Sequence, residues 1–301
     1  MNSDLKGLAR VADKRYLGYL AAALLTWLLI CAAPVHTAHA SVQAAKAQAK
    51  DQSNFIQAEF IQVVYLAETH TDTADHRAQL EIVQALAEQA GLEDREVAIA
   101  LEMFQRPFQP ALDAYLAGEM TEAELIAQSE YETRWGYDWE FYAPILRYAK
   151  AEKIAAIALN TPTEITRKVA NSGLSSLSPT DFADIPPLAD IDIADLAYRT
   201  RMAEAFEAHG GVGNSTGFEN FFAAQVLWDE TMADRIVQQL IAEPAQQVIV
   251  LVGEGHVAYN QGIVSRVARR LPDVKQLSIR LMPIESEVEP GFADAVWFTS
   301  P

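Results

Sequence analysis

Short, continuous runs of apolar residues alternate with amphipathic stretches along most of the chain. The apolar runs cover residues 62–66, 97–101, 154–159, 247–252 and 276–282. Runs without polar alternation are typical of strands that are covered on both faces. The stretches between them that carry apolar side chains at helical spacing are residues 75–90, 142–150 and 263–271. This order predicts an α/β fold with a mainly parallel sheet flanked by helices.

Two helical segments interrupt this alternation. Residues 108–150 are rich in aromatic side chains, and residues 180–240 contain two long helical patterns, at 195–208 and 218–240. We expect these insertions to form a smaller helical domain or a lid over the carboxyl edge of the sheet. The α/β domain is then predicted to span residues 59–284, and the acidic tail, residues 285–301, is predicted to be loose.

The N-terminus has the three parts of a secretory signal peptide. A basic segment is followed by an apolar run at residues 16–33 and by an A-x-A site that ends at Ala40. Residues 1–40 are therefore predicted to be removed on export, and residues 41–58 to form a lead-in segment. The expected location is the periplasm or another extracytoplasmic space. The alternative is an uncleaved apolar segment that anchors the protein, which would be its only association with a membrane.

Charge and cysteine content exclude several classes of function. The formal net charge is −18, which disfavours binding to the phosphate backbone of a nucleic acid. The single cysteine, Cys31, lies within the predicted signal peptide. The mature chain is therefore expected to have no disulfide and no thiol nucleophile.

Polar residues directly follow the apolar runs. Ligands of an open parallel sheet bind beyond the carboxyl ends of its strands, so these side chains are candidates for a shared site. They are Glu68, His70, Glu102, Asn160, Glu254 and His256. Glu102 follows five apolar residues, and burying an unpaired carboxylate is costly, so a histidine or a cation is expected beside it. His76 begins the next helix, with Gln79 on the same helical face.

The stretch "LVGEGHVAY", residues 251–259, also fits a loose dinucleotide-binding pattern, Gly-x-Gly-x-x-Ala. It follows the fourth strand rather than the first, and Asp273 lies in a turn rather than at a strand end, so the pattern is weak evidence for such a loop. We expect instead that Gly253 and Gly255 let the chain turn sharply and present Glu254 and His256 at the sheet edge.

Several separated segments together resemble the ChaN family of haem-binding proteins associated with iron uptake. They are "LAETHTDTADHRAQ", "ALEMFQRPFQPALDAYLAGE", "WGYDWEFYAPIL", "ALNTPTEITRKVA", "NFFAAQVLWDETMA" and "GEGHVAYNQGI". The resemblance covers roughly residues 60–283 and extends to the related Tiki metalloproteases and erythromycin esterases. The family's first Gly-Glu-x-His motif has Ala67 in place of glycine here, and its second motif, Gly253 to His256, is intact.

The resemblance implies two functions, both of which stay open at this point. The first is an exported protein that binds haem without covalent attachment, as a homodimer, through a tyrosine ligand. The residues predicted to bind the ligand are His76, Tyr137, Tyr142, Asn160 and Glu254. The second is a hydrolase of the esterase or peptidase kind, with or without a divalent metal ion. Its catalytic and metal-binding residues would be Glu68, His70, Glu102 and His256.

Overall fold

The computed structural model describes residues 60–208 and 215–300. The predicted signal peptide, residues 1–40, and the lead-in, residues 41–58, lie outside the described residues. Within the described ranges, no helix is both long enough and apolar enough to cross a membrane.

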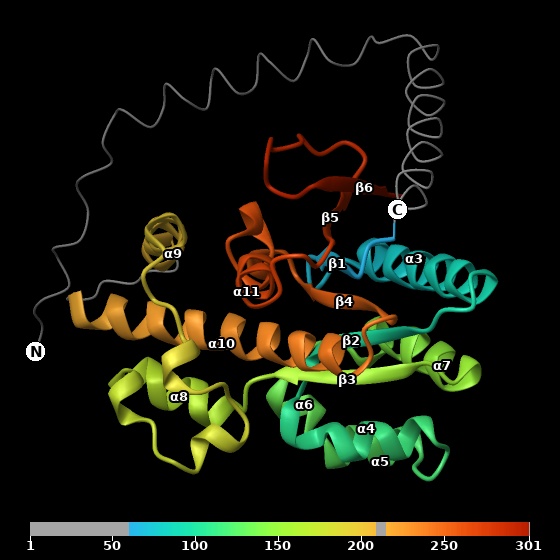
Figure 1. Cartoon of the computed structure of the whole chain (residues 1–301), viewed down its shortest axis with the longest axis horizontal. Coiled ribbons are helices and arrows are strands. Elements are labelled where there is room, and N and C mark those ends of the chain that lie inside the picture. Colours follow the sequence, from blue (N-terminus) through green and yellow to red (C-terminus); the bar gives the residue numbers. More distant parts are fainter. Residues whose placement is uncertain (1–59, 209–214, 301) are drawn as a thin grey trace, which may run out of the picture. The chain divides into compact units, whose positions relative to one another are not determined.

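Six parallel strands form one sheet in the order β3-β2-β4-β1-β5-β6 (Figure 1). They are β1 (Val63–Glu68), β2 (Val97–Gln105), β3 (Ala155–Asn160), β4 (Gln247–Gly253), β5 (Gln276–Pro283) and β6 (Ala295–Thr299). This confirms the predicted α/β class with a parallel sheet. β1 and β4 lie side by side, with Glu68 opposite Gly253 at their carboxyl ends.

The structure corrects the predicted sheet at two places. β2 continues to Gln105, so Glu102 lies within the strand rather than after it. The tail that we predicted to be loose contains β6, which pairs with β5 from Ala295 to Thr299. Its sequence, Ala-Val-Trp-Phe-Thr, is rich in residues that favour strands, and it covers a strand edge that would otherwise be unpaired.

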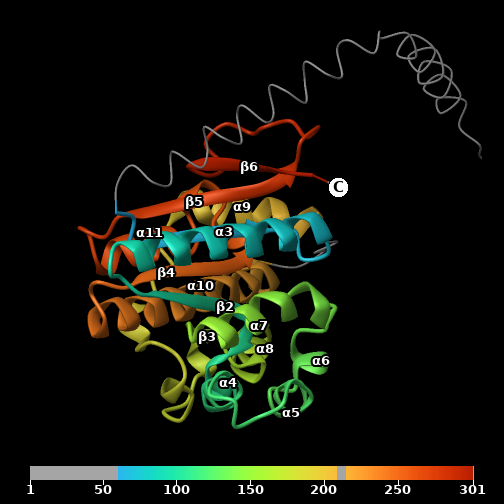
Figure 2. The same cartoon turned by 90° about the vertical axis from the view of Figure 1, so that its right-hand side faces the viewer.

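Helices cover both faces of the sheet. One face packs against α3 (Thr73–Leu92) and α7 (Ala143–Glu152), and the other against α10 (Ser215–Ala242) and α11 (Ile263–Arg270). In Figure 2, α3 lies in front of the sheet and α10 lies behind it. Successive strand residues point to opposite faces, so Glu68 points to the α3 face and Glu102 to the α10 face.

The two insertions are continuous with these layers. The first contains α4 (Gln109–Leu116), α5 (Glu122–Gln128) and α6 (Tyr131–Arg134), and it leads into α7. The second contains α9 (Leu196–Ala208) and α10, and it follows α8 (Thr163–Ser172). The second insertion is more than a lid, because the C-terminal half of α10 packs on the sheet while its N-terminal half packs on α8 and α9. Short 3-10 turns connect these elements: η1 (Arg106–Phe108), η2 (Trp139–Phe141), η3 (Leu174–Ser176), η4 (Asp181–Ala183), η5 (Leu188–Asp190), η6 (Glu254–His256) and η7 (Ala258–Asn260).

Candidate functional site

The end of β4 is the centre of the site, because Gly253 lets the side chain of His70, in the turn after β1, cross over it. A Cβ atom on Gly253 would lie 2.7 Å from both Cε1 and Nε2 of His70. The backbone of Gly253 is extended, at φ −61° and ψ 141°. Gly255 lies in η6, and a Cβ atom there would meet open space. The expected turn is therefore found at Gly255, within η6, whereas Gly253 is extended and is needed for the close approach of His70.

Glu68 is the centre of a buried cluster on the α3 face. It is 1% exposed, and its carboxylate accepts hydrogen bonds from the Tyr142 hydroxyl at 2.5 Å, His70 Nδ1 at 2.9 Å and Gln79 Nε2 at 2.5 Å. His76 Nδ1 lies 3.4 Å from the same carboxylate. The free-energy cost of burying the Glu68 carboxylate is offset by these hydrogen-bond donors. Because His70 Nδ1 is one of them, Glu68 also fixes the orientation of the His70 imidazole.

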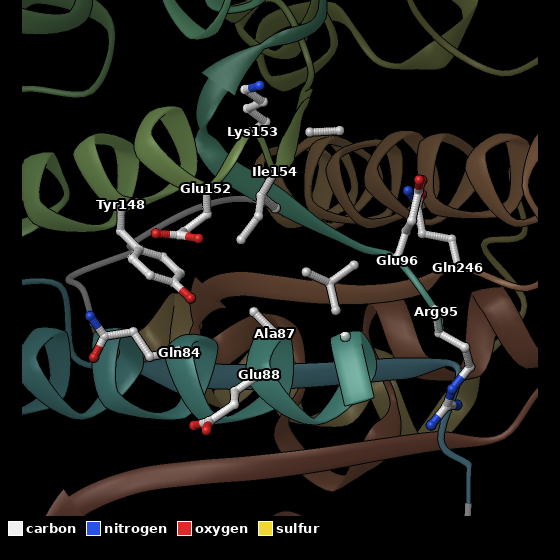
Figure 3. Close-up of a pocket in the computed structure, with 13 residues that line it drawn as sticks. Gln84, Ala87, Glu88, Arg95, Glu96, Tyr148, Glu152, Lys153, Ile154 and Gln246 are labelled. Atoms are coloured by element: carbon white, nitrogen blue, oxygen red, sulfur yellow. The ribbon is translucent and has the colours of Figure 1, made fainter. Parts of the chain in front are cut away.

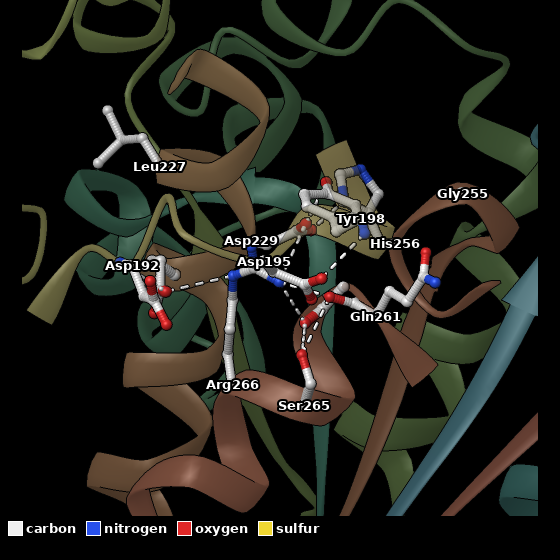
Figure 4. Close-up of polar contacts among 12 residues, drawn as sticks. Asp192, Asp195, Tyr198, Leu227, Asp229, Gly255, His256, Gln261, Ser265 and Arg266 are labelled. Atoms are coloured by element: carbon white, nitrogen blue, oxygen red, sulfur yellow. Dashed lines mark hydrogen bonds and ion pairs between the residues drawn. The ribbon is translucent and has the colours of Figure 1, made fainter. Parts of the chain in front are cut away.

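A second cluster lies on the α10 face. Glu102 Oε2 accepts a hydrogen bond from the Gly253 N–H at 2.7 Å, and Glu102 Oε1 lies 3.3 Å from His256 Nε2. On the other side of the imidazole, His256 Nδ1 lies 2.6 Å from Asp229 Oδ1, and the hydroxyl of Tyr198 donates to Asp229 Oδ2 at 2.5 Å (Figure 4). A tyrosine, a carboxylate and a histidine are therefore joined on each face of the sheet, and the two groups approach each other at Gly253.

The charges of this site are coupled. Burial lowers the pKa of His256, but the carboxylates of Glu102 and Asp229 outweigh burial and raise it to about 10. Burial raises the pKa of Glu102, but His256, His70 and the Gly253 N–H outweigh it, so this pKa is lowered. Burial likewise lowers the pKa of His70, but its hydrogen bond to Glu68 and the charge of Glu102 outweigh burial, so this pKa is raised. At neutral pH, His256 is thus an imidazolium held between two carboxylates.

The α3 side of the site opens to solvent between aromatic rings. The side chain of His70 is 26% exposed, and its ring lies 4.9 Å from those of Trp135 and Tyr137, centroid to centroid. Tyr137 is half-buried, whereas Tyr142 is 1% exposed and its hydroxyl is bonded to Glu68. Burial strongly raises the pKa of Tyr142, and the charge of Glu68 adds to this effect. Of the two tyrosines predicted to bind a ligand, only Tyr137 is open to one.

The other three residues predicted to bind a ligand are engaged with the protein. His76 is buried, its ring stacks on Phe141 at 4.6 Å, and its Nε2 donates to the His70 carbonyl. Asn160 is also buried and donates to the Glu102 carbonyl at 2.7 Å. The half-exposed Glu254 is paired with Arg280 Nε at 2.8 Å. His76 and Asn160 therefore support the backbone around the site.

Sequence reasoning did not identify Asp229 and Tyr198. Both lie in the second insertion, and α10 brings Asp229 to the sheet beside Glu102. The available signal was the pair Asp229-Glu230 within an apolar helix, because adjacent buried acids require partners. Both are 0% exposed, and Glu230 is paired with three arginines of α11: Arg266, Arg269 and Arg270. The predicted proximity of Gln79 and His76 is confirmed, with 3.2 Å between their side chains.

The four predicted metal ligands are arranged as carboxylate–imidazole pairs. Glu68 is bonded to His70, and Glu102 to His256. In the part of the chain that the structure describes, no group of three histidine, aspartate or glutamate side chains is placed to hold a metal ion. Both nitrogens of His256 and Nδ1 of His70 are directed at carboxylates instead.

A hollow of about 620 Å³ opens at the opposite, amino edge of the sheet (Figure 3). Its apolar floor includes Val97 and Ile154, and charged side chains of both signs surround it, among them Glu88, Arg95 and Lys153. None of the residues that we predicted for the site lines this hollow. The carboxyl edge, where the strand ends bring their polar side chains together, is therefore the candidate site.

Comparison with known proteins agrees with this architecture. Residues 56–267 match the family described as haem-binding uptake, Tiki superfamily, ChaN. The chain is similar to the ChaN of Campylobacter jejuni solved with cofacial haem, at 17% identity and a TM-score of 0.66, covering 84% of this chain and 92% of that one. It is also similar to an erythromycin esterase in its open conformation, at 16% identity and a TM-score of 0.44, covering 74% of this chain and 70% of that one.

A plant protein is similar in sequence. It is the chloroplastic protein Reticulata-related 5 of Arabidopsis thaliana, 28% identical over 252 residues, which are 79% of this chain and 34% of that protein. The chain thus spans about a third of the length of this relative.

Proposed function

The chain belongs to the ChaN family of the Tiki superfamily, and we propose that it binds haem without a covalent bond at the carboxyl edge of its sheet. The observation that carries the proposal, beside the family, is the open phenol of Tyr137 against the imidazole of His70. Haem would supply a ferric iron, and phenolate is a ligand that suits ferric iron. Tyr137 is the residue that would hold it.

The surroundings of Tyr137 fit a flat, largely apolar ligand. Trp135 packs edge-on against both Tyr137 and His70, so aromatic surface lines this side of the site. His70 is held in place by Glu68, which is held in turn by Tyr142 and Gln79. The buried cluster therefore positions the ring against which Tyr137 packs, and it does so without occupying the open side.

Titration with ferric haem, followed by absorbance, tests this proposal. We expect a shifted Soret band with the wild-type protein, and loss of that shift in Tyr137→Phe. Tyr148→Phe is the matched control, because it removes a tyrosine hydroxyl that lines the hollow at the amino edge of the sheet, away from the site. A Soret shift that survives in Tyr137→Phe would assign the ligand elsewhere. No shift with wild-type protein would overturn haem binding.

Hydrolysis is the second candidate function, favoured by the buried pairs Glu68–His70 and Glu102–His256. A protonated His256 could serve as a general acid and not as a base, since both of its nitrogens face carboxylates. An ester-hydrolysis assay of the purified protein separates the two candidates. No haem spectrum, together with hydrolysis that is lost in His256→Gln, would favour the hydrolase.

We also propose that the protein is exported, contributes to iron uptake and forms a homodimer. Export is supported by the basic and apolar N-terminal pattern that ends at Ala40. Sequencing the N-terminus of the protein from a fractionated cell tests it, with Ser41 expected as the first residue. Light scattering with and without ferric haem tests the dimer.

A further inference from the structure

Arg201 connects α9 to the turn that carries His256. Its Nη1 donates to the carbonyl of Gly255 at 3.2 Å, and its Nε donates to Gln261 Oε1 at 3.0 Å. The guanidinium carbon lies 5.1 Å from the ring centroid of Tyr198. Gly255 and Gln261 are drawn beside His256 in Figure 4. A cation from α9 is therefore fixed against the backbone directly before His256.

Two buried N–H donors in this place have neither a hydrogen-bond acceptor nor an ion-pair partner; a third, Nε of Arg266, lies 3.3 Å from Glu230. One is Nη2 of Arg201, and the other is Nε1 of Trp228, whose ring lies 5.1 Å from that of His256. More than nine in ten buried polar groups in proteins have a hydrogen-bond partner. Arg201 contacts Gly255, and Trp228 contacts His256. Their two donors without hydrogen-bond partners therefore point to an acceptor that a ligand brings.

Arg201 is suited to an acidic ligand because its positive charge is not neutralised by its hydrogen-bond partners. Those partners within the described residues are a carbonyl and an amide. Arg280, by contrast, is paired with Glu254, and Arg266 with Glu230. The formal net charge of −18 repels anionic ligands, so an acidic ligand needs a local cation. The planar fork of arginine fits a carboxylate particularly well.

We infer that Arg201 and the indole N–H of Trp228 form an anchor for a carboxylate of the ligand. The inference rests on the proposed function, in which the ligand is haem and the carboxylate is one of its two propionates. Arg201 would supply charge and Trp228 a single neutral donor. The iron ligand would come from the α3 side of the site and the carboxylate anchor from the α9 and α10 side.

Haem and its dimethyl ester, both in the ferric form, separate this role from a structural one. The ester keeps the iron and the ring but has no carboxylate. Arg201→Gln is expected to weaken binding of haem by about tenfold to a hundredfold and to leave binding of the ester unchanged. Trp228→Phe is expected to act in the same direction with a smaller effect. Arg199→Gln is the control, since Arg199 lies on the same helix and is paired with Glu219.

The possible outcomes have distinct meanings. Equal weakening of haem and ester in Arg201→Gln would mean that Arg201 only supports the fold, and it would overturn the anchor. Unchanged binding of haem in Arg201→Gln would overturn the anchor while the proposed function stands. No binding of haem by the wild-type protein would overturn both. A thermal unfolding curve for each variant shows whether it has folded.

Discussion

The imidazole of His70 lies where a side chain on Gly253 would be. His70 lies two residues after the end of β1, Gly253 ends the adjacent strand β4, and a Cβ atom on Gly253 would be 2.7 Å from the ring. His70 can therefore cross the end of β4 and approach Glu102, whose charge helps to raise the pKa of His70. A glycine at this position joins the clusters on the two faces of the sheet into one site.

Gly253→Ala should displace His70. Overpacking of a buried position typically lowers the free energy of unfolding by about 1–3 kcal/mol, and we expect a loss in this range. Haem binding should weaken as well, because Tyr137 packs against His70. Chemical denaturation and haem titration measure the two effects. Gly255→Ala is the control, because its Cβ atom would meet open space two residues away. Equal behaviour of the two variants would contradict the role given to Gly253.

Asp229→Asn should lower the pKa of His256. The carboxylate lies 2.6 Å from His256 Nδ1, and an opposite charge at this distance typically shifts a pKa by about 1–3 pH units. The pKa of about 10 should therefore fall toward neutrality, although Glu102 remains. Histidine NMR signals followed against pH measure it. Asp234→Asn is the control, since that carboxylate is on the same helix and is paired with Arg106. An unchanged pKa would mean that Glu102 alone holds the proton.

The sequence predicts which edge of the sheet carries the polar side chains, because the relevant pattern is local, although β2 continues three residues past Glu102. Glu68 and Glu102 each stand at the end of an apolar run, and parallel strands bring such ends to one edge. Asp229 could not be placed in the same way, because its position depends on how α10 packs across the sheet. β6 was missed for a similar reason. Its own residues favour a strand, but it has only five of them, follows an acidic stretch rich in turn-forming residues and is fixed by pairing with the edge of β5.

Loss of the proton from His256 should make the protein less stable in alkaline solution. Its pKa in the folded protein, about 10, is above its ordinary value of 6.5. The stabilisation from its charge is therefore complete below pH 6.5 and is lost as the pH rises through 10. The raised pKa of His70 acts in the same direction. Free energies of unfolding across this pH range should decline in the wild-type protein and decline less in His256→Gln. Parallel curves for the two proteins would contradict this assignment.

Ionisation of Asp75 should lower the free energy of unfolding, which is the opposite of the effect expected for the paired carboxylates of the site. It is 0% exposed, its Oδ2 accepts from the Thr69 N–H, and its Oδ1 has no partner. Burial raises its pKa from 3.8 to about 6, and the charges of Asp72 and Glu68 act in the same direction. Because the folded state disfavours the ionised form, the free energy of unfolding should fall as the pH rises from 3.8 through 6.

Asp75→Asn should remove that dependence, because the amide keeps an oxygen for the Thr69 N–H and carries no charge. We expect the free energy of unfolding of Asp75→Asn, relative to that of the wild-type protein, to be higher at pH 8 than at pH 4. These two values lie on either side of the pKa of about 6. Chemical denaturation at both pH values gives the difference directly. A buried amide N–H without an acceptor has its own cost, but that cost is the same at both pH values. A difference that does not change with pH would show that Asp75 is neutral or fully solvated throughout.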